Sequence, residues 1–553
     1  MAIKYSKPNQ RWITRYYSHY NFLGSVVGMI FVILSFLPSL LPRGWVLQGV
    51  LSGVLFTFGY AIGMVASHFI RRFGPKEPKT AKKLQIKIYT LIVLFLLYLI
   101  AVVQGFRWQQ EVRELVSQPP EYSYSVIGTI IVTLLIAAFI LLIARSIRGL
   151  YWWLRRLINK HIPKPVAYTA AWIITVLLVI GILNGVVWSG AMSILNDFYS
   201  VKNGTTNDGI VQPTDPHLSG SPQSLIAWDT LGRQGRNFIG RVPTTQQLSN
   251  FSHSPAKQPI RIYSGLESAD STQDRAKLAV EDLKRAGGFQ RKIIEVATTT
   301  GTGWVDEEGA KPIEYMYNGD DAIVSMQYSY LPSSLSFLVD QQKAKDAGSQ
   351  LFNAVYNEAL NIPAAQRPKI VVFGESLGSY GGEAAFANEA TFRATSDGAV
   401  WAGPPNFNIL RKTATANRDS GSPEILPIYH HGQIVRFADV AGDFKNPSSP
   451  WDYPKAAYLE NASDPIVWWS PRLLFSKPDW LSEPRGADVS KYTVWLPIIT
   501  FWEVSGDMVF STGVPDGHGH KYGKMPTEAW SYVAPPDGWT QQKTEALKAE
   551  LSK

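Results

Sequence analysis

Long apolar stretches separated by short polar ones fill roughly the first two hundred residues, after which the apolar runs become short. A bilayer core about 30 Å thick needs about 20 mostly apolar helical residues to cross it, because backbone groups cannot stay unpaired in hydrocarbon. Five stretches meet this requirement, at residues 22–41, 45–69, 88–106, 126–144 and 166–195. The first lacks the small-residue cleavage site of a signal peptide, and four further stretches follow it. Residues 1–195 are therefore predicted to form an all-α transmembrane bundle of about five helices.

The basic residues between these stretches indicate an orientation. They gather before the first, third and fifth stretches: Lys4, Lys7, Arg11 and Arg15; Arg71, Arg72, Lys76, Lys79, Lys82, Lys83 and Lys87; Arg145, Arg148, Arg155, Arg156, Lys160 and Lys164. The two other connections are poor in basic residues. Because Lys and Arg concentrate in cytoplasmic loops, the N-terminus is predicted to be cytoplasmic. An odd number of spans then places everything after about residue 196 outside, in a multi-pass protein of the plasma membrane.

The predicted spans contain almost no ionisable side chains, apart from His68 at the end of the second. A proton pathway or a transporter of charged substrates needs such groups near the middle of the membrane. Transport is therefore kept only as a minor alternative, and the spans are expected to anchor the chain.

A different pattern begins beyond the last span. Residues 196–257 are rich in Asn, Gly, Ser, Thr, Pro and Gln, which indicates an extracytoplasmic linker or cap. From residue 258, short β-rich runs at 260–263, 292–297, 322–328, 369–373 and 399–401 alternate with helical stretches at 271–286, 337–360 and 379–389. This alternation is typical of a mainly parallel sheet with helices on both faces, so residues 258–553 are predicted to form an α/β domain.

Composition removes several function classes. The formal net charge of +9 comes largely from the basic clusters between spans, and no nucleic-acid-binding motif is present, so nucleic acid is not an expected partner. The chain has no Cys, which excludes disulfides, thiolate nucleophiles and Cys-based metal sites.

One stretch of the α/β region carries catalytic chemistry. The apolar run at 370–373 leads directly into Gly374-Glu375-Ser376-Leu377-Gly378, and small residues that open a helix follow. A Gly-x-Ser-x-Gly sequence between a strand and a helix is the context of a nucleophile elbow, in which the serine occupies a strained turn and larger residues at the glycine positions would collide with neighbouring elements. Ser376 is therefore the predicted nucleophile.

A serine hydroxyl needs a base to take its proton, and the base needs a carboxylate to orient it. With such an elbow the expected chain order is serine, acid, histidine. Only His518 and His520 follow Ser376 at sufficient distance, in a glycine-rich loop at 513–523, and we favour His518 because it follows the turn residues directly. The pair His430 and His431 precedes the best acid candidate and is expected to be structural. The spacing of His518 and His520 also fits metal ligands, but no motif supplies a third ligand, so no metal and no cofactor are predicted.

The acid candidates all follow apolar runs. Asp464 is the first choice because it lies in a turn beside Pro465, shortly after the run at 456–459. Asp439 and Asp443, which follow the run at 434–437, remain as alternatives, and Asp464 could instead be a turn-forming residue.

The oxyanion of the reaction needs backbone N–H donors. One is expected from Leu377, directly after the nucleophile, and the other from the Thr- and Gly-rich loop at 298–304, with Thr299 and Thr300 as candidates.

The chain also resembles a known group, the membrane-anchored α/β-hydrolase family of actinobacteria. The resemblance covers nearly the whole chain and rests on Ser39-Leu40-Leu41-Pro42-Arg43, Leu231-Gly232-Arg233-Gln234-Gly235-Arg236, Thr300-Gly301-Thr302-Gly303-Trp304, the elbow around Ser376, Ser463-Asp464-Pro465 with Trp468-Trp469, and Gly517-His518-Gly519-His520. It implies an α/β-hydrolase fold with a Ser, Asp and His triad, and it suggests cell-envelope lipid esters, including mycolate-type esters, as substrates.

The resulting hypothesis is a membrane-bound serine esterase, lipase or acyltransferase that acts on a lipid acyl ester. Amphipathic aromatic residues between positions 468 and 502 favour an interface with lipid, although they are equally typical of an ordinary domain core. A catalytically inactive binding or scaffold module is the main alternative. The sequence leaves open hydrolysis or acyl transfer, the identity of the acyl donor, and the oligomeric state.

Overall fold

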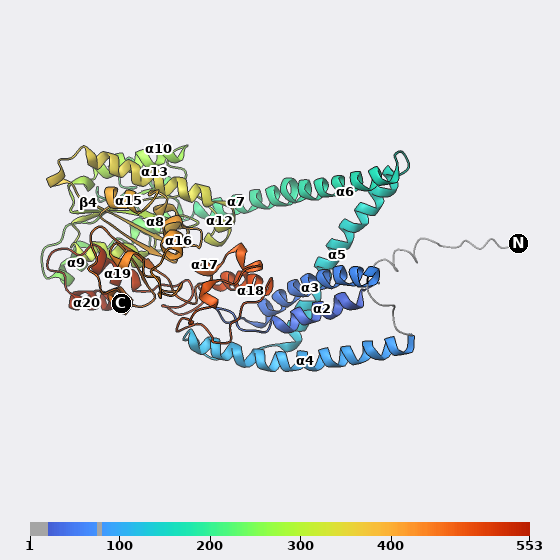
Figure 1. The fold of residues 1–553 in the computed structure, drawn as a ribbon. Helices are drawn as coiled ribbons and strands as arrows, with labels where there is room; N and C mark the ends of the chain where they lie inside the picture. The colour runs from blue at the N-terminus through green and yellow to red at the C-terminus, as the bar shows by residue number, and fades with distance from the viewer. Residues whose placement is uncertain (1–19, 74–79) are drawn as a thin grey trace. The chain divides into compact units, whose positions relative to one another are not determined.

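The computed structural model describes residues 20–73 and 80–553, and these divide into two compact units (Figure 1). The first, here called the membrane unit, contains the described residues up to Met192 together with Arg472–Ser476 and Ser490–Asp507. The second, the sheet unit, contains Ser193–Pro471, Lys477–Val489 and Met508–Lys553. The predicted basic residues Lys4, Lys7, Arg11, Arg15, Lys76 and Lys79 lie outside the described residues.

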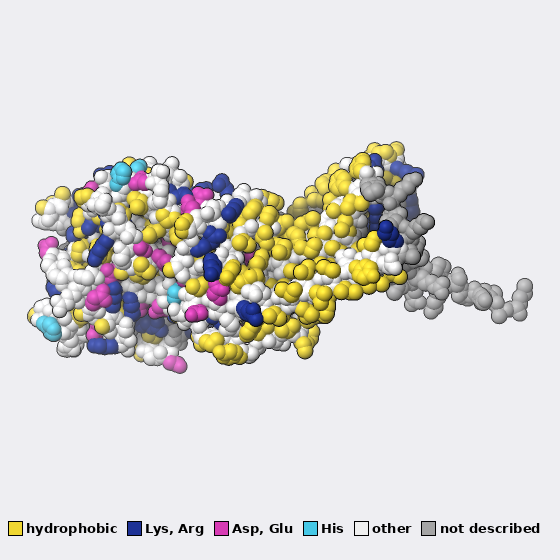
Figure 2. All heavy atoms as spheres, turned by 60° about the horizontal axis from the view of Figure 1, so that its bottom comes forward, with side chains coloured by type: hydrophobic (Ala, Val, Ile, Leu, Met, Phe, Trp, Pro, Cys, Tyr) yellow, Lys and Arg dark blue, Asp and Glu magenta, His cyan; other side chains and the backbone are white. Residues whose placement is uncertain are grey.

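Four helices of the described chain are long and apolar enough to cross a membrane. They are α3 (Trp45–Phe73), α4 (Thr80–Leu115), α5 (Val126–Ile158) and the continuous run of α6 (Lys164–Gly181), a π-helical turn (Ile182–Trp188) and α7 (Ser189–Asn203). Hydrophobic side chains dominate the surface over the apolar part of the long helices (Figure 2). A helix satisfies its own backbone hydrogen bonds, so such segments are stable in hydrocarbon.

The first predicted span is wrong in length. Residues 22–41 do not form one helix: α2 (Phe22–Leu34) ends after 13 residues, and bends and turns follow to residue 44. Pro38 explains the early end, because proline lacks the N–H that would pair with the carbonyl of Leu34 in a continuing helix. A helix of this length covers about 20 Å, less than the roughly 30 Å of a bilayer core. The described chain thus has four long apolar helices and a short one, instead of five spans.

Glycines bring the helices of the membrane unit close together. A Cβ added to Gly59 would stand 2.7 Å from the carbonyl oxygen of Val27, and one on Gly63 would stand 2.7 Å from that of Leu23. Helices α2 and α3 therefore pack backbone against backbone. Small residues serve this purpose in membranes, where hydrophobic association between helices is weak.

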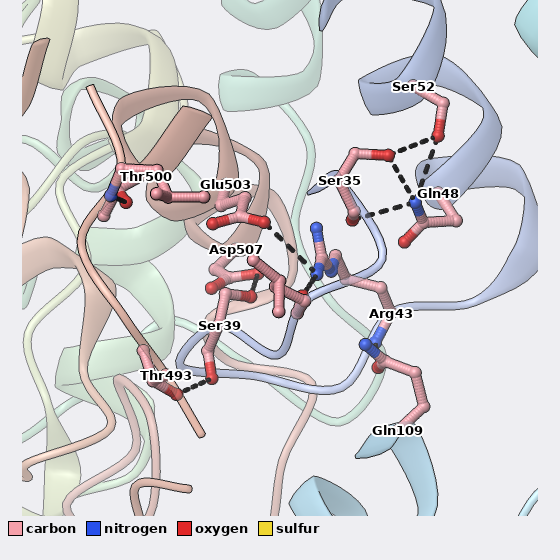
Figure 3. A network of polar contacts seen from close by, with 12 residues as sticks. Ser35, Ser39, Arg43, Gln48, Ser52, Gln109, Thr493, Thr500, Glu503 and Asp507 are labelled. Atoms are coloured by element: carbon pink, nitrogen blue, oxygen red, sulfur yellow. Dashed lines mark hydrogen bonds and ion pairs between the residues drawn. The ribbon is translucent and has the colours of Figure 1, made fainter. Parts of the chain in front are cut away.

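The short α2 is followed by a segment that binds a distant part of the chain. Helix α18 (Ile499–Asp507) buries Ile499 against Leu51 and Leu55 of α3. The Asp507 carboxylate accepts hydrogen bonds from Ser39 Oγ at 2.9 Å and from Leu40 N at 3.0 Å (Figure 3). The Ser39 to Arg43 stretch, one of the sequence motifs, thus holds a segment from near the C-terminus within the membrane unit.

The sheet unit contains seven strands in the order β1-β3-β2-β4-β5-β7-β6, and every neighbouring pair is parallel. The strands are β1 (Ile260–Ser264), β2 (Ile293–Thr298), β3 (Asp321–Met326), β4 (Lys369–Glu375), β5 (Gly398–Ala402), β6 (Val435–Ala438) and β7 (Lys455–Leu459). The longer helices are α8 (Gly232–Gly240), α9 (Thr245–Ser252), α10 (Thr272–Arg285), α11 (Glu307–Met316), α13 (Gln341–Leu360), α16 (Ile409–Ala416), α19 (Met525–Val533) and α20 (Gln541–Glu550), and the short ones are α12 (Ser333–Val339), α14 (Leu377–Glu383), α15 (Glu389–Thr395) and α17 (Pro465–Trp468).

Two apolar cores cover the two faces of this sheet. Successive residues of a strand point to opposite faces, and in β4 Ile370 and Val372 belong to one core while Val371 and Phe373 belong to the other. Helices α10 and α13 contribute to the first core, and α11 and α19 contribute to the second. The predicted fold, an all-α apolar helical region followed by a parallel sheet with helices on both faces, is confirmed.

Candidate active site

Ser376 occupies the turn between β4 and α14, as the elbow motif predicts. Its backbone has φ 54° and ψ −125°, a region that costs a non-glycine residue about 1–3 kcal/mol. The flanking glycines make the turn possible: a Cβ on Gly374 would stand 2.3 Å from the carbonyl oxygen of Gly378, and one on Gly378 would stand 2.3 Å from that of Thr298. The strain is held by the strand before Ser376, the helix after it, and a hydrogen bond from Ser376 N to Ala402 O at 2.9 Å.

Asp464 begins α17 and is completely buried. Its Oδ1 accepts a hydrogen bond from Ile466 N at 2.8 Å, and its Oδ2 accepts one from the Tyr522 hydroxyl at 2.7 Å. The same Oδ2 lies 2.7 Å from Nδ1 of His520. Both the turn-forming role and the pairing with a loop histidine are therefore present in one carboxylate.

His520 is held from several sides. Its ring is 6% exposed, it packs edge-to-face on Tyr522, and its backbone N donates to Ser511 O at 2.8 Å. Its Nε2 is buried and has no hydrogen-bond partner among the described residues. A Cβ on Gly403 would stand 2.4 Å from Cε1 of the ring, so the imidazole lies against the turn that begins at Ala402. Ser376 N is bonded to the same turn, which brings the serine and the imidazole to one end of β5.

The other loop histidine has a different acid. His518 Nδ1 lies 3.0 Å from Oδ2 of Asp488, a residue that sequence reasoning missed. Asp488 also accepts a hydrogen bond from Ser463, whose hydroxyl in turn accepts one from Gly519 N at 2.8 Å. The sequence favours His518 from its place after the turn, whereas the structure pairs His520 with Asp464. No motif surrounds Asp488 in the sequence, so no signal could have identified it.

Of the other acid candidates, Asp443 binds backbone N–H groups and Asp439 lies within electrostatic reach of His518 and Asp488. Both the Asp439 and Val440 backbone N–H groups donate at 3.0 Å to the Asp443 carboxylate, which gives Asp443 a turn-forming role. Burial, together with the nearby charges of Asp488 and Asp443, raises the pKa of Asp439 to about 7.

The adjacent histidines predicted to be structural lie away from the elbow. His430 is 3.6 Å from Glu389, and His431 is 3.3 Å from Asp419. Both side chains are well exposed. In the described part of the chain, no group of three or more His, Cys, Asp or Glu has the arrangement of a metal site.

The three residues predicted to donate N–H groups to the oxyanion, Leu377, Thr299 and Thr300, lie in two different segments of the sheet unit. Leu377 is the first residue of α14, where N–H groups have no carbonyl partner inside the helix. Thr299 follows β2 and is fully buried, and the carbonyl oxygens of Thr298 and Thr299 lie closest to the site of a Cβ on Gly378. The backbone N of Thr300, in contrast, donates to Trp304 O at 2.9 Å. Thr300 is therefore engaged, and Thr299 is the better placed of the two.

Two partly buried carboxyl groups, those of Glu375 and Asp306, adjoin the nucleophile. Burial raises the pKa of Glu375 well above its usual range, and its hydrogen bond with Asp306 and the negative charge there raise it further. Burial also raises the pKa of Asp306, to about 7. Burial and the neighbouring Asp306 both favour the protonated, uncharged form of Glu375, the residue directly before Ser376.

Apolar side chains surround the start of α14. Phe337, Leu377 and Ile466 form one buried cluster, against which Tyr380, Phe407, Trp469 and Met508 pack. The nucleophile is thus followed directly by a residue of a buried apolar cluster.

Comparisons with known proteins agree with this geometry. Residues 260–547 match the model of an alpha/beta-hydrolase family, and residues 36–243 match the model of that family's N-terminus. Neither the search of curated proteins nor that of solved structures finds a match. The first family match alone covers more than half of the chain and includes the sheet, the elbow and the loop of His518 and His520. The parallel sheet, the elbow at Ser376 and these matches together show that the chain belongs to the alpha/beta-hydrolase family.

Proposed function

We propose that this protein is a membrane-bound serine hydrolase in which Ser376, His520 and Asp464 form the catalytic triad. The observation that carries the proposal is the buried pair of Asp464 and His520, in which Oδ2 and Nδ1 lie 2.7 Å apart. The other ring nitrogen of His520, Nε2, has no hydrogen-bond partner among the described residues. The imidazole lies against the turn whose Ala402 carbonyl accepts a hydrogen bond from Ser376 N. A carboxylate on Nδ1 fixes the tautomer that leaves Nε2 free to accept a proton.

The proposed reaction is acyl transfer through a covalent intermediate. Nε2 of His520 takes the hydroxyl proton as Ser376 Oγ bonds to the ester carbonyl carbon, and the N–H groups of Leu377 and Thr299 stabilise the resulting oxyanion. The carbon–oxygen bond to the alcohol breaks, and His520 returns the proton to the leaving oxygen. Water or a second alcohol then attacks the acyl-enzyme by the reverse route, which gives hydrolysis or acyl transfer, respectively.

The experiment that tests this proposal is labelling of the purified full chain with a fluorophosphonate probe. Wild type and Ser379→Ala, which keeps the elbow and removes its other hydroxyl, should be labelled, whereas Ser376→Ala should not. Labelling of Ser376→Ala would show that another residue reacts. A folded wild type that takes no label, beside a control hydrolase that does, would favour the inactive scaffold.

The proposed substrate is an acyl ester of a cell-envelope lipid. It is supported by the apolar cluster at the start of α14 and by Phe475, which is 77% exposed. Of the other aromatic residues in this stretch, Trp468 and Trp480 are buried and pack on each other, so they support the domain core.

Chain-length preference tests the substrate class. Each methylene that enters an apolar site contributes about 0.8 kcal/mol, so the six additional methylenes of a nitrophenyl octanoate should raise kcat/KM by a factor of about 3,000 over the acetate. Phe337→Ala should reduce this preference, because Phe337 packs on Phe407 and Trp469 in the apolar cluster that includes Leu377. A higher kcat/KM for the acetate would contradict a lipid substrate.

We also propose that the protein lies in the plasma membrane with the sheet unit outside the cytoplasm. The basic residues at the C-terminal ends of α3 and α5, such as Arg72 and Arg156, support this orientation whether or not the short α2 crosses the bilayer. A reporter that is active only outside the cytoplasm should be active when fused to the C-terminus and silent when fused after Lys160. The opposite pattern would overturn both the orientation and the envelope substrate.

A further inference from the structure

The membrane unit contains a cavity of about 1140 Å³ that the proposed reaction does not use. Two long helices and the residues before α2 form its walls. The lining residues are Tyr20, Asn21, Thr57, Phe58, Tyr60, Ala61, Met64, Val65, Ser67, His68, Arg71, Ile140, Leu141, Ala144, Arg145 and Arg148.

Helix packing accounts for the position of this cavity. Nearer the start of α3, a Cβ on Gly49 would stand 2.7 Å from Val132, and one on Gly53 would stand 2.7 Å from Ile136, so α3 and α5 are in close contact there. The cavity lies farther along both helices, where its lining begins at Thr57 on α3 and at Ile140 on α5. Larger side chains replace the glycines at this level, and the α5 ribbon diverges from α3 (Figure 1).

The cavity has an apolar part and a cationic part. Phe58, Met64, Val65, Ile140 and Leu141 belong to the apolar part. The cationic part contains three guanidinium groups, Arg71 in the last turn of α3 and Arg145 and Arg148 farther from the end of α5. Among the residues that the structure describes, no carboxylate lines the cavity, and neither α3 nor α5 contains an Asp or a Glu.

Two contacts order the polar end of this cavity. The Arg145 guanidinium stands 4.4 Å from the centre of the Tyr20 ring, a cation–π geometry. Asn21 connects the start of α2 to α3, since its backbone N donates to the Tyr60 hydroxyl at 3.0 Å and its Nδ2 donates to Ser67 Oγ at 3.0 Å. The cationic groups therefore stand beside a fixed polar wall.

We infer that this cavity binds an anionic phospholipid, with the phosphate on the arginines and an acyl chain along the apolar wall. Guanidinium groups bind phosphate oxygens through paired hydrogen bonds, and basic pockets between transmembrane helices accept anionic headgroups. A soluble anion would leave the apolar wall unused. A zwitterionic lipid would place a quaternary amine beside three cations, and the described lining residues include no carboxylate to balance it.

Native mass spectrometry of the purified full chain tests this inference with phosphatidylglycerol and phosphatidylcholine of identical acyl chains. Wild type should retain phosphatidylglycerol preferentially. The double variant Arg145→Gln/Arg148→Gln should bind it about 25-fold more weakly, because each basic side chain contributes about a factor of five to binding of an anionic lipid. Ala61→Trp, which fills the cavity and keeps every arginine, should also reduce retention.

The matched control is Arg155→Gln/Arg156→Gln. It removes the same charge from the same helix, and Arg155 stands 3.5 Å from the ring centre of Tyr168, but neither residue lines the cavity. This variant should keep the affinity of wild type. An equal loss of phosphatidylglycerol binding in both double variants would mean that Arg145 and Arg148 act only as general charges at the membrane interface, and it would overturn the inference. Equal retention of phosphatidylglycerol and phosphatidylcholine by wild type would also overturn it, as would displacement of the lipid by inorganic phosphate. The unfolding midpoint of each variant, measured without added lipid, shows whether a loss reflects misfolding.

Discussion

Replacing His520 with alanine is expected to slow acylation of Ser376 by a factor of about 10⁴ or more. His520 is the histidine paired with Asp464, and its Nε2 is the nitrogen that would take the serine proton. Without it, the hydroxyl must lose its proton to water. The rate of fluorophosphonate labelling under single-turnover conditions measures this step directly.

His518→Ala is the matched control, because it removes the same ring from the same loop. His518 pairs with Asp488, so its loss should slow labelling far less than the loss of His520. Asp464→Asn should resemble His520→Ala, since an amide cannot hold the tautomer that frees Nε2, whereas Asp488→Asn should resemble His518→Ala. If His518→Ala proved the slower enzyme and His520→Ala labelled normally, the triad would have to be reassigned to His518 and Asp488.

The fold of the sheet unit could be predicted from short-range patterns. The five predicted strands match β1 to β5 to within two residues, because buried parallel strands appear as continuous apolar runs. The predicted helix at 337–360 is divided at Asp340 into α12 and α13, since Asp340 has a non-helical backbone (φ −112°, ψ 16°). The spans at 45–69, 88–106 and 126–144 correspond to α3, α4 and α5 for the same reason: hydrocarbon requires a long uninterrupted apolar run.

The site could be predicted only where chemistry fixes the residue type. Ser376 can be predicted because its strained turn needs the glycines on either side of it. His518 and His520 lie in the same loop, and both follow a glycine, so the sequence does not distinguish them. Their partners differ through the fold: Asp464 lies at the start of α17 and Asp488 in a loop 24 positions later in the sequence. Thr300 likewise follows the expected strand in the sequence, and only the fold shows that its backbone N–H donates to Trp304 O.

The role of the segment at 490–507 could not be predicted either. Its helix α18 has nine residues, too few to cross a bilayer, so no hydropathy argument assigns it to the membrane unit. The contacts that place it there join residues more than 450 positions apart in sequence, such as Ser39 and Asp507. Without an alignment, such pairs leave no trace in one sequence.

These contacts lead to the second large expected effect, a loss of stability in Arg43→Gln. Arg43 lies in the segment that connects α2 to α3, and its side chain is fully buried. Its Nη2 stands 3.9 Å from the Glu503 carboxylate, and its backbone N donates to Gln109 Oε1 at 2.6 Å (Figure 3). Burial raises the pKa of Glu503 to about 8 and that of Asp507 to about 6, while the positive charge of Arg43 opposes both changes. Removing the cation leaves two carboxyl groups buried together without a counter-charge. The expected cost at pH 8 is about 3–5 kcal/mol.

The pH dependence identifies the cause of that loss. A carboxyl group whose pKa is higher in the folded than in the unfolded state binds protons on folding, so its contribution to stability falls as pH rises from the unfolded to the folded pKa. Arg43→Gln should raise both folded pKa values further and make this fall steeper, so its melting temperature should drop more at pH 8 than at pH 5. Arg113→Gln, which loses a partly exposed pair with Glu121, should lose at most about 1 kcal/mol at either pH. If Arg43→Gln melted like wild type at pH 8, or lost equal stability at both pH values, Arg43 would not be the charge that compensates Glu503 and Asp507.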